Sequence, residues 1–484
     1  MSVRRSLVAS VTNRFAGVIM QILSSLVIAR LLAPAEFGLF GIASSVIAVS
    51  SSLREFGVTS YLIRLDTIDR HALGRALAFT MSISLTAGTV IFLSRHAIAA
   101  FFRDDAIAGL IAILCLNFIL IPPTIGAAAI IQRNLRFATL SLCQLGCLVA
   151  ALAATIAMAA SGLGPTSLAI GQVLQMALFL LCMTILDWRA VLVLPVFRGM
   201  GEMIRFGSFA ALSGVTNQLG TYTTSLVLGR LLGPAAVGIY DRGNGMYMPL
   251  ASDLVVTIGN VLYVGLSRVR HDSAALARLL LEAMRNLTAI TWPGFLLLAA
   301  LADPLITLMF GPPWAASVPV LQILCLSGLL TSATNLYYQT VLTMGATQRI
   351  LAIELAGQST RIAGILALAT FGVTGAATAA VIAMAVIFIL YLAAARRYIH
   401  ARRRDILHIY TESLALAAAT ATAPALLVLH NPLALPPLPL LAISGTIGLA
   451  TWLIAILATH HPLATELRTA ATQITSRVWP PKDR

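Results

Sequence analysis

Four arginines lie inside stretches of the chain that are otherwise apolar and long enough to cross a membrane: Arg14, Arg54, Arg242 and Arg361. A charged side chain at the centre of a bilayer costs at least about 2.5–3.5 kcal/mol, so an ionisable residue within a membrane span marks a functional site by default. The four arginines are therefore the first candidates for a site inside the membrane.

The four arginines differ in how deep they lie within their predicted spans. Arg14 and Arg54 lie toward the cytoplasmic side of their stretches, where a long side chain can instead extend to the membrane surface. Arg242 lies near the outer end of its stretch beside Asp241, which offers a structural ion pair. Arg361 lies near the middle of its stretch, too deep to reach the surface easily, and is the strongest candidate.

Two acids accompany the deeper arginines. Asp253 follows Arg242 by eleven residues, about three helical turns, so both lie on one helix face. Glu354 precedes Arg361 by seven residues on one face and is its expected partner. We consider both acids as sites that couple transport to a proton or cation; for Asp253 the alternative is a buried ion pair.

The composition shows which elements must position these side chains. The 484 residues are 59% hydrophobic and 10% charged, against about 25% charged residues in soluble domains. A soluble multi-domain enzyme is therefore excluded, and an all-α polytopic membrane protein is predicted. Apolar runs and helix breakers predict about 14 transmembrane helices, at 8–29, 37–58, 73–94, 106–127, 138–160, 166–186, 206–229, 236–260, 287–308, 318–342, 350–370, 374–395, 411–430 and 438–459.

The distribution of Lys and Arg predicts which ends of these spans face the cytoplasm. With the N-terminus inside, 25 of the 32 Lys and Arg residues fall in or beside cytoplasmic segments, and four fall outside. We therefore expect a multi-pass protein of the inner (cytoplasmic) membrane with both termini in the cytoplasm. The net charge of +14 is explained by topology, and no nucleic-acid partner is predicted.

A sequence repeat divides the chain. Residues 25–40, SLVIARLLAPAEFGLF, align without a gap to residues 225–240, SLVLGRLLGPAAVGIY, with nine of sixteen positions identical. Each copy is expected to end one span and open the next at an R-L-L-x-P turn, where Pro stops the first helix. Six spans separate the copies, so the repeat is parallel, as in two-lobed transporters.

The repeat predicts three parts of the chain. Residues 1–195 would form an N-terminal lobe of six helices, residues 196–395 a parallel C-terminal lobe of six helices, and residues 396–484 a basic loop, two further helices and a tail. The five cysteines all lie in apolar stretches and the histidines show no metal-ligand spacing, so neither a metal site nor a cofactor is predicted.

Four motifs, in their order and spacing, resemble those of Wzx-type polysaccharide flippases: A-R-L-L-x-P-x-x-F-G-L-F at 29–40, E-F-G at 55–57, G-I-Y-D-R-G at 238–243 and F-G-P-P-W at 310–314. This family belongs to the multidrug/oligosaccharidyl-lipid/polysaccharide exporter superfamily, together with MATE exporters and the peptidoglycan-precursor flippase. The resemblance covers about residues 1–395. It implies two MATE-like lobes, a central cationic cavity and transfer of an undecaprenyl-diphosphate-linked oligosaccharide to the outer leaflet by alternating access.

The resemblance also gives the candidate residues roles. Arginine suits a diphosphate, because its planar fork binds phosphate oxygens in pairs. Amide and tyrosine side chains suit sugar hydroxyls, and two groups of them lie in the seventh and tenth spans: Asn217 and Gln218, and Asn335, Tyr338 and Gln339. The alternative for both groups is hydrogen bonding between helices of one lobe. The partners would be the lipid-linked oligosaccharide, the bilayer, and a polymerase and glycosyltransferases of the same pathway.

Two other functions are alternatives to this one. A MATE-like drug or cation antiporter typically has an acid in the first span, whereas residues 8–29 contain neither Asp nor Glu. A membrane enzyme of the same pathway would be expected to have a large polar loop with paired acids or a His. The longest segments between predicted spans, near 187–205 and 261–286, are short and basic, so the protein is expected not to be an enzyme.

Overall fold

The computed structural model describes residues 20, 23–51, 58, 62, 69–197, 218, 220–399, 402–432, 434–459 and 461–464. Within these residues all regular secondary structure is helical. Among the described residues, eight helices are long and apolar enough to cross a membrane, or up to ten if each of two bent pairs forms one span. The predicted all-α multi-pass membrane fold is confirmed, while the total of 14 spans stays a prediction.

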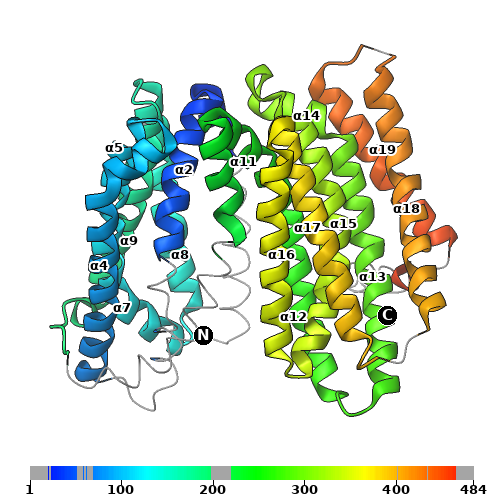
Figure 1. The fold of residues 1–484 in the computed structure, drawn as a ribbon, viewed down its shortest axis with the longest axis horizontal. Coiled ribbons are helices and arrows are strands. Elements are labelled where there is room, and N and C mark those ends of the chain that lie inside the picture. The colour runs from blue at the N-terminus through cyan, green and yellow to red at the C-terminus, as the bar shows by residue number, and fades with distance from the viewer. Residues whose placement is uncertain are drawn as a thin grey trace, which may run out of the picture. The chain divides into compact units, whose positions relative to one another are not determined.

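The chain groups into two compact units, residues 1–241 and 242–484. In the first unit α9 packs against α8 and α7, and α5 packs against α4 and α2 (Figure 1). Its helices are α2 (Pro34–Ser51), α4 (Arg70–Phe102), α5 (Ala106–Leu114), α6 (Asn117–Leu120), α7 (Pro122–Arg133), α8 (Phe137–Ala160) and α9 (Pro165–Val191). Helix α11 (Pro234–Met248) begins in this unit and ends in the next.

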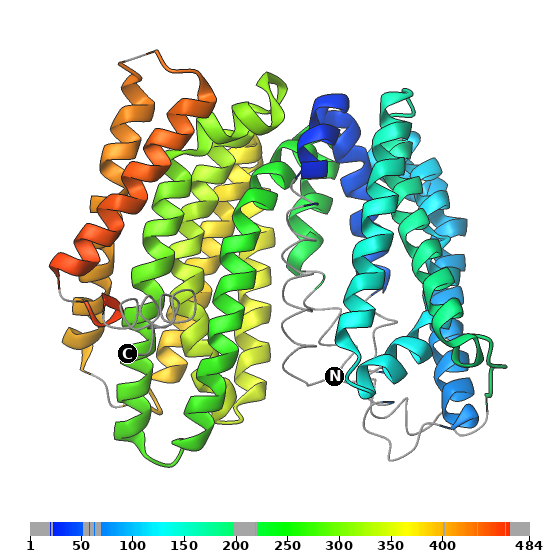
Figure 2. The same ribbon diagram turned by 180° about the vertical axis from the view of Figure 1, so that it is seen from behind.

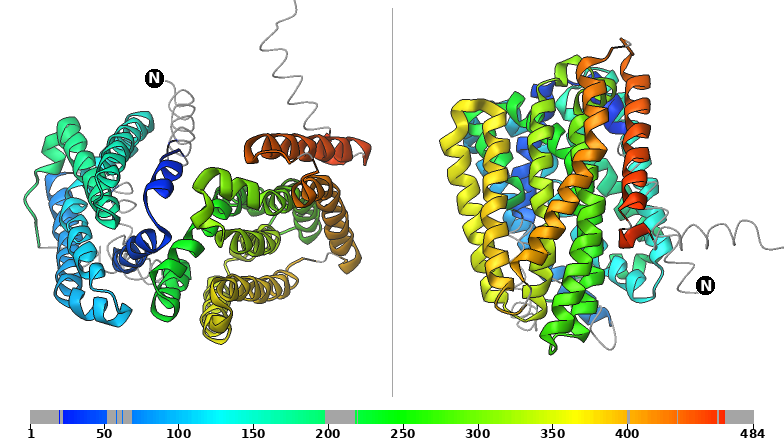
Figure 3. Two further views of the ribbon diagram at one scale, coloured as in Figure 1. Left: turned by 90° about the horizontal axis from the view of Figure 1, so that it is seen from above. Right: turned by 90° about the vertical axis from the view of Figure 1, so that its right-hand side faces the viewer.

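The second unit contains the remaining helices: η1 (Pro249–Leu254, a π-helix), α12 (Val255–Arg268), α13 (Ser273–Ala300), α14 (Ala302–Phe310), η2 (Pro312–Trp314), α15 (Ser317–Thr343), α16 (Thr347–Leu368), η3 (Ala369–Phe371), α17 (Gly372–Ala395), α18 (Arg403–His430) and α19 (Pro437–Ala458). Helix α15 packs against α17 and α13, and α16 pairs with α17. Figure 3 shows α16 and α17 at one edge of this unit and α19 at the opposite edge.

The last two long helices, α18 and α19, are packed against the other helices of the second unit (Figure 2). Helix α18 lies along α13, and α19 lies along α18. A buried core of α12, α13, α15 and α17 also takes in Ile406 and Ile409 of α18. The indole of Trp452 in α19 donates a 2.9 Å hydrogen bond to the carbonyl of Ala289.

The structure corrects one part of the span prediction. The basic segment 261–286, expected between spans, is mostly helical, with only residues 269–272 between α12 and α13. Asp272 starts α13 by accepting hydrogen bonds from the amides of Ala274 and Ala275. Hydropathy marks only the part of a helix that lies in lipid, so it underestimates a helix that continues beyond the membrane.

Two predicted spans are also bent. The segment 106–133 bends by 47° before Pro122, and α13 and α14 meet at 64° around Leu301. Proline lacks the amide hydrogen that a continuous helix needs, which explains the first bend.

Candidate functional site

Both repeat turns form as the sequence predicts. Residues 23–31 are helical, the helix ends at residues 32–33, and α2 begins at Pro34. In the second copy residues 220–232 are helical, Gly233 interrupts them with a φ of +85°, and α11 begins at Pro234. Proline suits the first position of a helix because its missing amide hydrogen would lack a helical partner there anyway.

The two copies contact each other reciprocally inside the first unit. A β-carbon placed on Gly38 would overlap the carbonyl oxygen of Pro234, and one placed on Gly238 would overlap that of Pro34. The backbone nitrogens of Gly238 and Gly38 lie 2.9 and 3.2 Å from the other residue's β-carbon position. Only glycine allows the backbones of α2 and α11 to approach so closely. The repeated glycine is thus explained by this contact.

One turn further along α11, Arg242 lies in an aromatic cage formed by Phe310 and Trp314. Its guanidinium carbon is 4.5 Å from the centroid of each ring, and the residue is 5% exposed. Both rings are buried, Phe310 at the end of α14 and Trp314 in η2. Desolvated cation–π contacts contribute roughly 2 kcal/mol or more. Two of the motifs noted in the sequence, G-I-Y-D-R-G and F-G-P-P-W, therefore meet at this cage.

Asp241, which precedes Arg242 in the sequence, also has contacts in the first unit. Its Oδ1 accepts a 2.8 Å hydrogen bond from the hydroxyl of Ser225. Its Oδ2 lies 2.8 Å from the position that a β-carbon on Gly41 would occupy. An ion pair between Asp241 and Arg242 stays a prediction.

Arg361 lies in the middle of α16 and is half-buried. Glu354, seven residues earlier on the same helix, accepts a 2.7 Å hydrogen bond from the hydroxyl of Tyr391 on α17. Tyr391 lies in the last turns of α17, so this hydrogen bond forms about two helical turns from Arg361.

The amides and tyrosine of α15 point in two directions. Asn335 and Gln339 face α12, where a β-carbon placed on Gly259 would meet both side chains. Gln339 is 4% exposed, which suits packing between helices. Tyr338 instead meets Tyr391 edge to face, with ring centroids 5.8 Å apart, and lies beside Glu354.

Several predicted residues lie outside the described part of the chain. They are Arg14, Arg54, Asn217 and the side chain of Asp253, whose backbone belongs to η1. Gln218 is described and half-buried. The roles of all these residues stay predictions.

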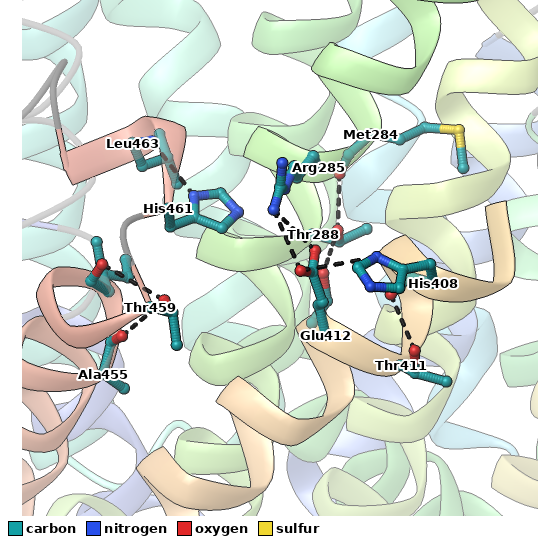
Figure 4. A network of polar contacts seen from close by, with 12 residues as sticks. Met284, Arg285, Thr288, His408, Thr411, Glu412, Ala455, Thr459, His461 and Leu463 are labelled. Atoms are coloured by element: carbon teal, nitrogen blue, oxygen red, sulfur yellow. Dashed lines mark hydrogen bonds and ion pairs between the residues drawn. The ribbon is translucent and has the colours of Figure 1, made fainter. Parts of the chain in front are cut away.

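A polar network that the sequence analysis did not identify joins α13 to α18 (Figure 4). Arg285 binds both carboxylate oxygens of Glu412 at 3.1 Å, and His408 Nδ1 lies 3.7 Å from Glu412 Oε1. One turn further, the hydroxyls of Thr288 and Ser413 are 2.7 Å apart. These partners are more than 120 residues apart, so no local pattern in the sequence indicates them.

His461, just after α19, lies beside this network and is 6% exposed (Figure 4). Burial lowers the pKa of His461, the Arg285 guanidinium lowers it further, and the Glu412 carboxylate partly opposes both. A neutral imidazole is consistent with its apolar neighbours Leu463 and Ala464, which pack against α13 and α18. The network therefore fastens the C-terminal helices to α13 within the second unit.

The fold is that of a multi-helix membrane transporter. It is similar to the lipid II flippase MurJ in an inward closed conformation, with a TM-score of 0.75, 13% identity, and coverage of 94% of this chain and 100% of that chain. It is also similar to an inward-facing multidrug resistance MATE family transporter of the MOP superfamily, with a TM-score of 0.63, 16% identity and coverage of 79% and 94%. At these identities the likeness shows the fold alone.

The chain belongs to the family described as "Polysaccharide biosynthesis protein", whose profile matches residues 27–319. It is 24% identical over 312 residues to the lipopolysaccharide biosynthesis protein WzxC of Escherichia coli K12, covering 64% of this chain and 63% of that protein. It is 26% identical over 321 residues to the succinoglycan biosynthesis transport protein ExoT of Rhizobium meliloti, with the same coverage. Each match thus spans slightly less than two thirds of the relative. The predicted resemblance is confirmed.

Proposed function

We propose that this protein moves undecaprenyl-diphosphate-linked oligosaccharide units across the cytoplasmic membrane for surface polysaccharide biosynthesis, of O-antigen or exopolysaccharide type. The family match over residues 27–319 is the observation that carries this proposal. A fold similar to that of a lipid II flippase supports it. The name of ExoT, which describes a transport protein for succinoglycan biosynthesis, points the same way.

In this proposal Arg361 binds the diphosphate headgroup. It lies in the middle of α16, which is proposed to cross the membrane, so its charge would lie deep in the bilayer. Arg14 and Arg54 are proposed as further headgroup ligands. Arg242 is also a proposed headgroup ligand, and its guanidinium carbon lies 4.5 Å from the centroids of two aromatic rings, Phe310 and Trp314.

Polar residues are proposed to bind the sugars and the coupling ion. Five of them are proposed to face the oligosaccharide: Asn217, Gln218 and, on α15, Asn335, Tyr338 and Gln339. Glu354 is one proposed coupling residue, and its carboxylate accepts a 2.7 Å hydrogen bond from the Tyr391 hydroxyl. Asp253 is the second.

The topology follows the positive-inside rule. We propose an inner-membrane protein with both termini in the cytoplasm and lobes at residues 1–195 and 196–395, followed by residues 396–484 with the last two spans. The repeat turns at Pro34 and Pro234 then lie on the outer face. A polymerase and glycosyltransferases would act on the same lipid-linked units before and after transfer.

A drug or cation antiporter is the second candidate, because the fold is also similar to that of a MATE transporter. The absence of an acid from residues 8–29 and the polysaccharide family favour the flippase over the antiporter. An enzymatic role is not part of the proposal.

The test is substitution of Arg361 in a strain whose surface polysaccharide depends on this protein. Arg361→Ala should abolish export while the protein stays in the membrane, because an uncompensated diphosphate cannot cross hydrocarbon. Arg361→Lys should retain part of the export, because it keeps the charge but loses paired binding. Full export by Arg361→Ala would exclude Arg361 as a headgroup ligand.

Arg349 provides the matched control. It lies on the same helix at its exposed end, where it donates a 2.7 Å hydrogen bond to the Tyr398 hydroxyl. Arg349→Ala removes the same charge outside the membrane, so export should continue. Equal loss in both variants would indicate a general effect of charge on insertion.

A further inference from the structure

Helix α16 packs against α17 along a stripe of small residues. A β-carbon placed on Gly357 would overlap the side chain of Ile387, and one placed on Gly364 would lie 3.0 Å from the β-carbon of Ala379. The two glycines are seven residues apart, so they lie on one face of the helix. This face is therefore filled by α17 and has no room for a ligand.

A second face of α16 is apolar and exposed. Its large side chains are 37–57% exposed: Leu351, Leu355, Ile362 and Leu366. They are spaced by four, seven and four residues, which places them in one stripe along the helix. In a membrane-spanning helix such a stripe contacts lipid, because lipid tails are as apolar as leucine.

Between these two faces lies a polar stripe of Glu354, Gln358 and Arg361. The three residues are at positions i, i+4 and i+7, and all are half-buried. Polar and ionisable residues in membrane spans almost always face the interior of the protein or a water-filled cavity. The stripe therefore belongs to the inner side of α16, and the sequence predicted a role only for its two charged ends.

Gln358 differs from Glu354 in its hydrogen bonding. Glu354 accepts the 2.7 Å hydrogen bond from Tyr391. The Oε1 atom of Gln358 is buried, and no residue in the described part of the chain donates a hydrogen bond to it. A buried acceptor without a donor destabilises a folded protein, so such groups are rare in native structures. A ligand that supplies a donor at this position would remove that cost.

The chemistry of the proposed substrate identifies such a donor. Gln358 and Arg361 are three residues apart, about 4.5 Å along the helix axis. If Arg361 binds the diphosphate, Gln358 can reach a group bonded directly to it. The diphosphate has two neighbours in the lipid-linked oligosaccharide, the polyprenyl chain and the first sugar. The hydrocarbon chain has no hydrogen-bond donor, whereas a sugar has hydroxyl donors and, in acetamido sugars, an amide donor.

We propose that Gln358 binds the first sugar of the lipid-linked oligosaccharide, with its Oε1 accepting a hydrogen bond from a hydroxyl or acetamido group of that sugar. This inference rests on the proposed function and on the assignment of the diphosphate to Arg361. Arg361 then binds the charge that every undecaprenyl diphosphate carries. Gln358 distinguishes the glycosylated lipid from the bare carrier, because only the sugar satisfies its buried acceptor.

A structural role for Gln358 makes different predictions. If its amide joins two helices by a hydrogen bond, an apolar replacement lowers the melting temperature and affects all substrates alike. If its acceptor serves the sugar, an apolar replacement of the same length removes an unsatisfied buried oxygen from the free protein. The melting temperature then stays the same or rises, and only the glycosylated lipid binds more weakly.

The test compares Gln358→Met, which keeps the length of the side chain without the amide, with Gln358→Asn, which keeps the amide on a shorter chain. Gln348→Met is the matched control, because Gln348 is an exposed glutamine in the first turn of the same helix. Each full-length protein is purified in detergent. Its half-saturating concentration is measured for undecaprenyl diphosphate and for the same lipid carrying one glucose or one N-acetylglucosamine.

Wild type should bind at least one of the glycosylated lipids about tenfold more tightly than undecaprenyl diphosphate, as expected for one buried hydrogen bond. Gln358→Met should lose this preference while its binding of undecaprenyl diphosphate is unchanged. Gln358→Asn should retain part of the preference, and Gln348→Met all of it. In cells, surface polysaccharide should decrease in Gln358→Met and remain normal in Gln348→Met.

Three results would each overturn the proposal: equal binding of bare and glycosylated lipids by wild type, an unchanged preference in Gln358→Met, or a lower melting temperature of Gln358→Met. Wild-type protein that binds none of the three lipids would contradict the proposed function instead. Arg361→Ala separates the two assignments. It should weaken binding of all three lipids equally and leave the preference for the sugar, whereas Gln358→Met should affect only the glycosylated lipids.

Discussion

The two copies of the repeat are alike up to their glycines and differ one turn later. Pro34 and Pro234 each begin a helix, and Gly38 and Gly238 lie in reciprocal contact. Four residues after the glycine, the first copy has Ile42, which is fully buried, while the second has Arg242.

The same turn therefore has two parts: residues that make a contact shared by both copies, and later residues that differ between the copies. The shared residues make a symmetric contact, which requires the same small residue on both sides. The residues that follow are free to diverge, because they pack against different helices. In the second copy the divergent residue is a cation held between Phe310 and Trp314. The second copy therefore differs from the first at Arg242, which contacts two aromatic rings.

The largest effect should come from breaking the symmetric contact. Gly38→Ala and Gly238→Ala each add a methyl group against a backbone carbonyl, which no side-chain rotation can relieve. Overpacking of this kind costs about 1–3 kcal/mol. Both variants should lower the melting temperature and reduce export, and by similar amounts because the contact is reciprocal.

Gly245 is the control for this pair. It lies on α11, and a β-carbon there meets no atom within 4 Å. Gly245→Ala should be neutral or stabilise the helix by up to about 1 kcal/mol, because alanine has the higher helix propensity. If Gly238→Ala behaves like Gly245→Ala, the contact between the copies does not form in the membrane.

A smaller effect should follow from a capping contact that only the first copy has. Glu36 accepts a 2.8 Å hydrogen bond from the amide of Ala33, whereas the second copy has Ala236 at that position. Glu36→Ala should lower the free energy of unfolding by about 1 kcal/mol, as for other helix N-terminal caps. Glu36→Gln keeps an acceptor and should retain most of the stability, as measured by thermal unfolding in detergent.

The smallest effect is expected at the arginine before the second turn. Arg230 lies 5.1 Å from one ring, Phe101, and is half-exposed, unlike Arg242. Arg230→Met should cost about 0.5–1 kcal/mol, the range for exposed cation–π contacts. A loss as large as that of Arg242→Met would show that the second ring and the burial of Arg242 add nothing.

Local rules explain what the sequence predicted well. Proline at the start of α2 and α11 acts within its own turn, so the positions of both turns follow from the sequence alone. The apolar runs likewise predicted α8, α17 and α19 to within two residues at either end. Helix boundaries outside the lipid, such as the start of α13, depend on capping and were missed.

Contacts between distant segments could not be predicted in this way. The spacing along α16 relates Glu354 only to Arg361, whereas the hydrogen bond from Tyr391 to Glu354 comes from the neighbouring helix. Both motifs of the aromatic cage were recognised in the sequence, but nothing in either motif indicates the other. A side chain's partners depend on which helices pack together. Helical periodicity shows only which residues share a face of one helix.

The sequence by itself determined that this is a helical membrane protein, where its repeat turns lie and which family it resembles, because hydropathy, proline and glycine act locally. Only the tertiary structure decided that the two glycines meet, and that the guanidinium of Arg242 contacts the rings of Phe310 and Trp314. These features depend on backbone approach and ring geometry between segments tens to hundreds of residues apart, which only the packed chain defines.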